Sequence, residues 1–295
     1  MLQAKTTGGW LAAAALVVNA FIWGVSWWPF RELQNQGLHP LWATAAIYLV
    51  ACLGMLLVYP VAIKQLLANP LLWWVALAAG LTNVAFNWAV TVGDVVRVVL
   101  LFYLMPAWTV LAAWVMLGER PTRSSMLRLL LAMTGVLMVL KSPTMPWPIP
   151  QNTADWLALV GGLCFAVTNV LLRKFNHTPG GARMMAMFLG GAALAGAAAL
   201  LGLALQNIPS PTLAGTAIWA FLGLSVAFII GNAAFQYGAA RLPPTTTSLV
   251  MLTEILFASV SAALLGAADF SPRVFWGGSL IILAALLAAL AHHKE

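Results

Sequence analysis

The chain has 295 residues, of which 62% are hydrophobic and 7% are charged, and its mean hydropathy is +0.94. Soluble domains carry about 25% charged residues, so this composition excludes a water-soluble fold and predicts helices of about 20 apolar residues that span a bilayer. The net charge of +7 does not indicate nucleic acid binding, because the basic residues lie in short segments between apolar runs, where they indicate membrane orientation.

Ten apolar runs follow one another along the chain, bounded by proline, glycine, asparagine and charged residues. The first half is expected to contain helices at about residues 10–30, 41–63, 71–90, 95–117 and 124–140. The second half is expected to contain helices at about residues 155–174, 183–205, 213–238, 245–265 and 273–291. These runs predict an all-α polytopic membrane protein with ten transmembrane helices.

A proline-rich stretch separates the two groups of five helices. The segment 142–150 contains four prolines, which is typical of a stiff linker. The predicted organisation is a first five-helix repeat at residues 1–141, a linker at 142–154 and a second five-helix repeat at 155–295.

Lysine and arginine are distributed unevenly between the two sides of such a bundle. One side has ten of them: Lys5, Lys64, Arg120, Arg123, Arg128, Arg173, Lys174, Arg183, Arg241 and Lys294. The other side has four: Arg31, Arg97, Lys141 and Arg273. Because basic residues are retained in cytoplasmic loops, we expect both termini to be cytoplasmic. Arg97 is expected to pair locally with Asp94.

The two halves share a motif in their third helix. A shift of 149 positions lays Asn83-Val84-Ala85-Phe86-Asn87-Trp88 on Asn232-Ala233-Ala234-Phe235-Gln236-Tyr237. A weaker similarity aligns Trp23-Gly24-Val25-Ser26 with Phe165-Ala166-Val167-Thr168. Because each half has an odd number of helices, the second copy must cross the membrane in the opposite direction. This predicts two inverted repeats with a substrate site between them.

Glu254 is the only acidic residue near the middle of a predicted helix. A carboxylate at that depth is costly, so it either faces a cavity, where it binds a substrate ammonium or a proton, or is hydrogen-bonded between helices. Pro106 interrupts the predicted helix at 95–117 and frees a backbone carbonyl, which favours a kink that lines the cavity.

Other polar and aromatic residues inside the helices are further candidates for substrate contact. The ligand is expected between Asn83, Asn87 and Trp88 on one side and Asn232, Gln236 and Tyr237 on the other. The alternative is that the amides only join helices and the aromatic rings only pack. The remaining candidates for the site are Trp23, Tyr103, Pro106, Thr168, Asn169 and Glu254, and Asn19 and Ser26 are further interior polar residues.

Several segments resemble the drug/metabolite transporter superfamily, in its EamA-type ten-helix branch. In the first half they are Ala20-Phe21-Ile22-Trp23-Gly24, Tyr103-Leu104-Met105-Pro106-Ala107-Trp108 and Leu117-Gly118-Glu119-Arg120-Pro121-Thr122. In the second half, the segment 253–258 resembles the family pattern Leu-Glu-Pro-Val-Phe-Ala, with Ile255 where proline is usual. The segment 265–269 is a degraded copy of the Leu-Gly-Glu motif.

Within this family, Ala45-Ala46-Ile47-Tyr48 and Tyr103-Leu104-Met105-Pro106 most resemble the YddG-type aromatic amino-acid and methyl viologen exporters. This resemblance adds Tyr48 to the candidate contacts. It implies export across a bacterial-type inner membrane, cytoplasmic termini, and a cavity formed mainly by the first, third, fourth, sixth, eighth and ninth helices.

These observations predict a secondary transporter that exports small amphipathic metabolites by alternating access. Aromatic amino acids are the expected substrates, with threonine and methyl viologen as further ones, and the lipid bilayer is the surrounding partner. A broad multidrug or metabolite carrier and an intramembrane lipid-modifying enzyme are the alternatives.

No motif predicts an enzyme, a cofactor, a metal, ATP or nucleic acid. The chain has no glycine-rich phosphate loop, and Cys52 and Cys164 do not have the spacing of metal ligands. The pair His292-His293 lies in the tail beyond the last helix. A single deep carboxylate does not supply the paired groups that catalysis requires.

Overall fold

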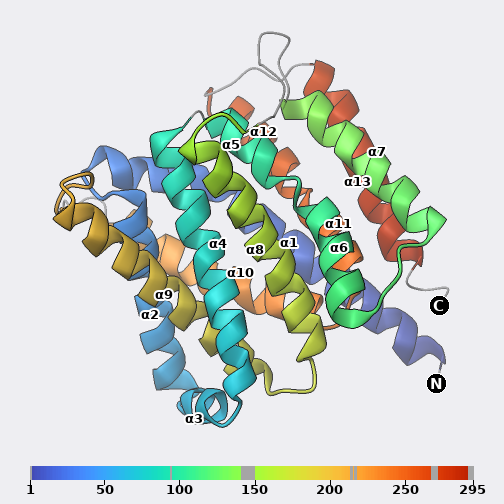
Figure 1. Cartoon of the computed structure of the whole chain (residues 1–295), viewed down its shortest axis with the longest axis horizontal. Coiled ribbons are helices and arrows are strands. Elements are labelled where there is room, and N and C mark those ends of the chain that lie inside the picture. Colours follow the sequence, from blue (N-terminus) through green and yellow to red (C-terminus); the bar gives the residue numbers. More distant parts are fainter. Residues whose placement is uncertain are drawn as a thin grey trace.

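The computed structural model describes residues 2–93, 95–140, 150–212, 215, 218–266 and 272–291. These residues form helices and connecting turns, and no strand is found among them (Figure 1). Ten of the described helical segments are long and apolar enough to cross a membrane. The predicted fold class is therefore confirmed: the protein is an all-α multi-pass membrane protein. Asp94, most of the predicted linker and the pair His292-His293 lie outside the described residues.

The first half crosses the membrane five times. The first two crossings are α1 (Leu2–Asn35) and α2 (Pro40–Val58), and the short helices α3 (Val61–Leu67) and η1 (Pro70–Leu72) lead into the third, α4 (Trp73–Val92). The fourth crossing consists of α5 (Val95–Phe102) and α6 (Met105–Leu117), and the fifth is α7 (Arg123–Leu140). The predicted helix at 41–63 is corrected here, because Pro60 disfavours helical geometry at Tyr59 and ends α2 at Val58.

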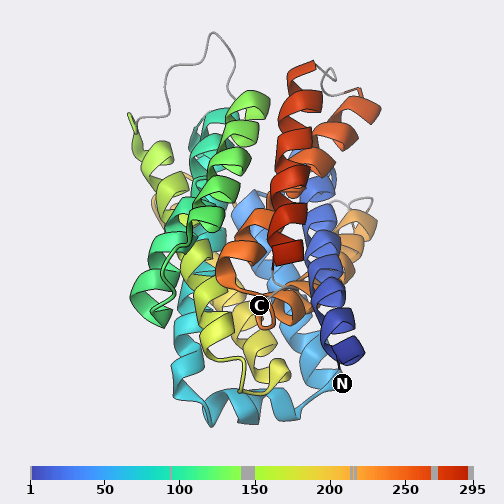
Figure 2. The same ribbon diagram turned by 90° about the vertical axis from the view of Figure 1, so that its right-hand side faces the viewer.

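The second half repeats this order. Its first three crossings are α8 (Thr153–Lys174), α9 (Gly180–Ala204) and α10 (Ile218–Ala239). The fourth consists of α11 (Pro244–Met251) and α12 (Glu254–Leu264), and the fifth is α13 (Pro272–Ala291). In Figure 2 the N- and C-terminal ends of the chain both lie in the lower half of the view, as an even number of crossings requires.

The fourth crossing of each half is broken at the corresponding place. α6 begins at Met105 and α12 begins at Glu254, 149 positions later. Pro106 contributes to the first break because its nitrogen carries no N–H. The crossing predicted at 245–265 is present but is not one continuous helix, because the N–H groups of Leu252 and Thr253 bond to carbonyls three residues back, as in a 3₁₀ turn.

The close helix contacts mostly join the two halves. α1 packs on α10 and α8 packs on α4, so the third crossing of each half lies against the first crossing of the other. Corresponding crossings also pair with each other, α2 with α9 and α7 with α13 (Figure 1). The result is one bundle in which the two halves interleave. Large apolar side chains such as Leu57, Val58 and Val115 are exposed on its outside, as expected for contact with lipid.

Glycines allow the first crossing of each half to approach the break in the other half. A Cβ atom on Gly24 in α1 would lie 2.7 Å from the backbone oxygen of Glu254. A Cβ atom on Gly162 in α8 would lie 2.6 Å from the backbone oxygen of Phe102, the carbonyl to which Pro106 cannot donate. The backbone at each break therefore packs directly against a glycine of the other half, Gly24 or Gly162.

A buried ion pair joins the start of α5 to the start of α8. The Arg97 Nε atom lies 3.0 Å from Asp155 Oδ1 and 2.9 Å from Asp155 Oδ2. Asp155 is 1% exposed and also accepts a hydrogen bond of 2.8 Å from the backbone N–H of Gln151. As an acidic residue in the first turn of α8, it also suits the positive end of the helix dipole.

Candidate functional site

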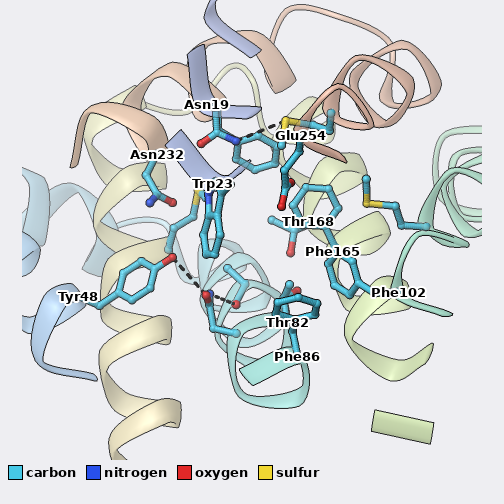
Figure 3. Close-up of a pocket in the computed structure, with 16 residues that line it drawn as sticks. Asn19, Trp23, Tyr48, Thr82, Phe86, Phe102, Phe165, Thr168, Asn232 and Glu254 are labelled. Atoms are coloured by element: carbon cyan, nitrogen blue, oxygen red, sulfur yellow. Dashed lines mark hydrogen bonds between the residues drawn. The ribbon is translucent and has the colours of Figure 1, made fainter. Parts of the chain in front are cut away.

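A cavity lies where the first three crossings of each half meet the two broken crossings (Figure 3). Its volume is about 60 Å³. Sites for small molecules usually have roughly 300–1,000 Å³, so an aromatic ligand requires these walls to move apart. The lining residues are Asn19, Trp23, Tyr48, Ala79, Thr82, Asn83, Phe86, Phe102, Met105, Phe165, Thr168, Met187, Asn232, Phe235, Met251 and Glu254.

The lining of the cavity follows the internal repeat. α4 contributes Ala79, Thr82, Asn83 and Phe86, which have the i, i+3, i+4, i+7 spacing of one helix face. Five pairs of lining residues are separated by 149 positions: Asn19 and Thr168, Asn83 and Asn232, Phe86 and Phe235, Phe102 and Met251, and Met105 and Glu254. The cavity therefore lies at the junction of the halves, and Glu254 occupies the place that Met105 has in the first half.

Phenylalanine rings form one wall of the cavity. The centroids of Phe86 and Phe102 are 4.7 Å apart, and those of Phe102 and Phe165 are 6.0 Å apart. Phe165 stacks on Phe235 at 5.4 Å. These rings come from α4, α5, α8 and α10, so four helices together present an apolar surface suited to an aromatic group.

Two asparagines of the repeated motif occupy equivalent positions. The Asn83 and Asn232 side-chain nitrogens donate to backbone carbonyls four residues earlier, at 2.8 and 2.9 Å respectively. The Tyr48 hydroxyl donates a hydrogen bond of 3.3 Å to Asn83 Oδ1. This bond connects α2 to α4 at the edge of the cavity.

Glu254 is the first residue of α12, directly after the break. Its side chain is partly exposed and lines the cavity, where Figure 3 shows it between Trp23 and Thr168. The Tyr103 side chain lies close to its carboxylate. The break thus places a carboxylate at the inner surface of the bundle with one neutral partner.

Six of the predicted site residues line this cavity, and seven lie outside it. Those that line it are Trp23, Tyr48, Asn83, Thr168, Asn232 and Glu254. Tyr103 and Pro106 are buried behind the lining, where Tyr103 reaches Glu254 and Pro106 forms part of the first turn of α6. The predicted kink at Pro106 is present, although the proline itself is not a lining residue.

The second polar residue of each motif copy points elsewhere. Asn87 donates a hydrogen bond of 2.6 Å to Thr44 Oγ1 in α2, and so joins two helices. Gln236 is buried, and a Cβ atom on Gly180 in α9 would lie 3.2 Å from its side-chain nitrogen.

The other three predicted residues also lie away from the cavity. Trp88 packs on an apolar cluster that includes Leu41 and Ile208. The Arg241 guanidinium lies 3.6 Å from the centroid of the Tyr237 ring, as a cation–π pair. Asn169 is fully buried within α8.

The prediction missed most of the apolar lining. Phe86 and Phe235 could have been predicted, because both occupy the same position of the repeated motif. Phe165 could also have been predicted, because it lies in the weaker internal similarity. Nothing in the sequence distinguishes the remaining apolar lining residues from ordinary core. These are Ala79, Phe102, Met105, Met187 and Met251.

The comparisons with known proteins support this architecture. Residues 10–141 match the sequence model of the EamA-like transporter family. No curated protein sequence matches the chain. Among solved structures 29 chains match, and one crystal structure is similar over 95% of this chain and 97% of its own, with a TM-score of 0.74 and 19% identity. At that identity the likeness shows the fold alone. The first five crossings are therefore similar in sequence to the EamA-like transporter family.

Proposed function

We propose that the protein is a secondary transporter that exports small amphipathic metabolites across a bacterial-type inner membrane by alternating access. Aromatic amino acids are the proposed substrates, with threonine and methyl viologen as further ones, as in the YddG-type exporters. The observation that carries this proposal is the carboxylate of Glu254, held within the bundle in a cavity with a phenylalanine wall. Carboxylates at such depth mark substrate or proton pathways.

The proposed architecture places the two halves, residues 1–141 and 155–295, on opposite sides of this cavity. Substrate sites of transporters with inverted repeats lie near the midplane between the repeats. The EamA-like match of residues 10–141 and the repeat pairs in the lining support this arrangement. Rocking of one half against the other would widen the cavity and expose it to each side in turn.

Uptake of radiolabelled phenylalanine and threonine into proteoliposomes tests the proposal, with empty liposomes as control and with and without an imposed pH gradient. We expect saturable flux of phenylalanine that exceeds flux into empty liposomes. A change of flux with the gradient would implicate a proton in the cycle. Flux equal to that of empty liposomes for both amino acids would contradict the amino-acid assignment.

The Glu254→Gln variant isolates the role of the carboxylate. We expect it to fold, because glutamine keeps the size of the side chain and its capacity to accept hydrogen bonds. Its transport rate should fall by about tenfold or more, since a buried charge partner is lost. The Glu119→Gln variant is the matched control, because Glu119 is exposed in the turn after α6. Wild-type rates in Glu254→Gln over a range of pH would refute the role of the carboxylate.

A broad multidrug or metabolite carrier is the second candidate, and one observation favours it. Three methionines, Met105, Met187 and Met251, line the cavity. Methionine adapts its shape readily and is frequent at promiscuous binding surfaces. Competition separates the two candidates: structurally unrelated cations should inhibit phenylalanine flux if the cavity is promiscuous, and only close analogues should do so if it is selective.

A further inference from the structure

The described lining of the cavity contains an acidic residue but no basic one. Glu254 is acidic, and none of the 16 described residues that line the cavity is lysine, arginine or histidine. A ligand carboxylate that leaves water for this cavity therefore meets no cation, although a buried charge without a partner is costly. A ligand ammonium meets the carboxylate of Glu254.

The hydroxyl donors of the lining are already engaged. Tyr48 donates to Asn83 Oδ1 at 3.3 Å, Thr82 donates to the backbone oxygen of Ala78 at 2.8 Å, and Thr168 donates to that of Cys164 at 2.9 Å. A hydroxyl has one O–H, so these three side chains present only oxygen lone pairs to a ligand.

The asparagines add acceptors to the same surface. A backbone carbonyl only accepts, so the nitrogens of Asn83 and Asn232 each direct one of their two N–H groups to a carbonyl of their own helix, and their side-chain oxygens point elsewhere. Asn19 directs its nitrogen to Met251 Sδ at 3.4 Å, and its buried oxygen has no hydrogen-bond partner among the described residues. This oxygen is an acceptor without a donor, nine-tenths buried at the cavity wall.

The backbone N–H groups around the broken crossings are also engaged. The backbone N–H groups of Leu252, Thr253, Ile255 and Leu256 all bond to carbonyls three residues back, and that of Leu104 does the same at the first break. The break before Glu254 therefore does not act as a cluster of free N–H groups that could hold a carboxylate.

We infer that the cavity recognises the ammonium group of an aromatic amine and that a ligand carboxylate is not a recognition element. An ammonium has three donors and a positive charge, which match Glu254, the unpaired Asn19 oxygen and the neighbouring hydroxyl lone pairs (Figure 3). Trp23 and the phenylalanine wall take the ring and offer aromatic faces to the cation. The inference rests on the proposed function and narrows its substrate class to aromatic amines, which include those without a carboxylate.

Three ligands of equal ring size test this assignment on the purified full-length protein in detergent by isothermal titration calorimetry. They are 2-phenylethylamine, phenylalanine, and 3-phenylpropionate, which has the carboxylate but no amine. The amine should bind at least about tenfold more tightly than phenylalanine, and 3-phenylpropionate should not bind measurably. Equal or tighter binding of phenylalanine or 3-phenylpropionate would overturn the inference.

Variants of Glu254 provide the second measurement. Glu254→Asp keeps the charge and should keep the preference for the amine, whereas Glu254→Gln should lower amine affinity about tenfold or more. Glu119→Gln should bind as the wild type does. An unchanged amine affinity in a folded Glu254→Gln protein would overturn the assignment of the ammonium to this carboxylate.

Flux through proteoliposomes distinguishes failure of the inference from failure of the proposed function. Tight binding of 2-phenylethylamine without flux of any ligand would refute transport and leave the recognition of the amine in place. Saturable phenylalanine flux that 2-phenylethylamine does not inhibit would refute the inference and retain the transporter. Absence of binding by all three ligands would refute the inference directly.

Discussion

Tyr48 shows how one side chain connects a peripheral helix to the cavity. Its ring is 2% exposed and lies 6.0 Å from Phe188 and 5.9 Å from Phe228, measured between centroids. Its hydroxyl reaches Asn83 across the boundary between α2 and α4. Packing therefore holds the ring, and the hydrogen bond sets the orientation of the Asn83 amide.

The Tyr48→Phe variant should separate these two contributions. Hydrogen bonds between membrane helices contribute about 0.6 kcal/mol on average and up to about 1.7, so we expect a loss of unfolding free energy in this range. Amine binding should change by less than about threefold, because Glu254 carries the charge. Unfolding in a mild denaturing detergent measures the first effect, with Tyr59→Phe at an exposed tyrosine as control. A loss above about 3 kcal/mol would show that the ring has moved.

The two amides of the motif show what the sequence could and could not predict at this scale. Asn83 and Asn87 are four residues apart, and helix periodicity gives them the same face. Asn83 lines the cavity, whereas Asn87 bonds to Thr44 of α2. The choice between ligand contact and helix contact depends on which neighbour lies opposite, and this is a property of the packed bundle that periodicity does not contain.

At the scale of helices, the contact between α1 and α12 determines where Glu254 sits. Gly24 leaves room for the backbone oxygen of Glu254 itself, so the position of the carboxylate depends on the absence of a side chain in another helix. The break in the second half was not predicted because position 255 is isoleucine, and no proline marks the interruption.

The Gly24→Ala variant should displace the start of α12. A Cβ atom 2.7 Å from a backbone oxygen forces the helices apart, at a cost of about 1–3 kcal/mol, and amine affinity should fall with the displacement of Glu254. Gly223→Ala is the matched control, because a Cβ atom there meets nothing within 4 Å, and alanine should be neutral or stabilising by up to about 1 kcal/mol. Equal behaviour of both variants in thermal unfolding and calorimetry would contradict this account.

The ion pair between α5 and α8 allows a double-mutant cycle. Asp155→Leu removes the carboxylate from the buried Arg97 cation and should cost about 3–5 kcal/mol of unfolding free energy. The double variant Arg97→Met with Asp155→Leu should be more stable than Asp155→Leu, because no buried charge is left. Denaturation of the wild type, the single variants Arg97→Met and Asp155→Leu, and the double variant gives the coupling energy between the two side chains. A double variant no more stable than Asp155→Leu would indicate that other bonds of Asp155, such as that from Gln151, dominate.

For the whole molecule, the membrane orientation is the prediction that remains to be measured. In a protein without Cys52 and Cys164, new cysteines at Asn176 and Ser210 would lie in exposed connections on opposite sides of the predicted bundle. If the ten-to-four distribution of basic residues determines the orientation, an impermeant maleimide added to intact cells should label Ser210→Cys. It should label Asn176→Cys only after the cells are opened. The reverse pattern would place both termini outside.

The number and approximate limits of the crossings could be predicted because lipid imposes a length and a composition on each one. The corrected end of α2 at Val58 lies just before a proline. Hydropathy averaged over a long window does not register the effect of a single proline on the backbone. The sequence predicted two inverted repeats, but it did not predict that their helices would interleave. Which helices touch, for example α8 with α5, depends on small residues such as Gly162 that permit close approach.

The Arg97–Asp155 pair has a kinetic consequence, because the internal repeat supplies no counterpart. The position equivalent to Arg97 in α11 is Thr246, which is buried and neutral, and no ion pair is described there within the residues that the structure covers. To part α5 from α8, two charges must be hydrated again, whereas parting α11 from α1 exposes neutral groups. We therefore expect one slow and one fast half-cycle, with only the slow one accelerated by higher ionic strength as its charges separate.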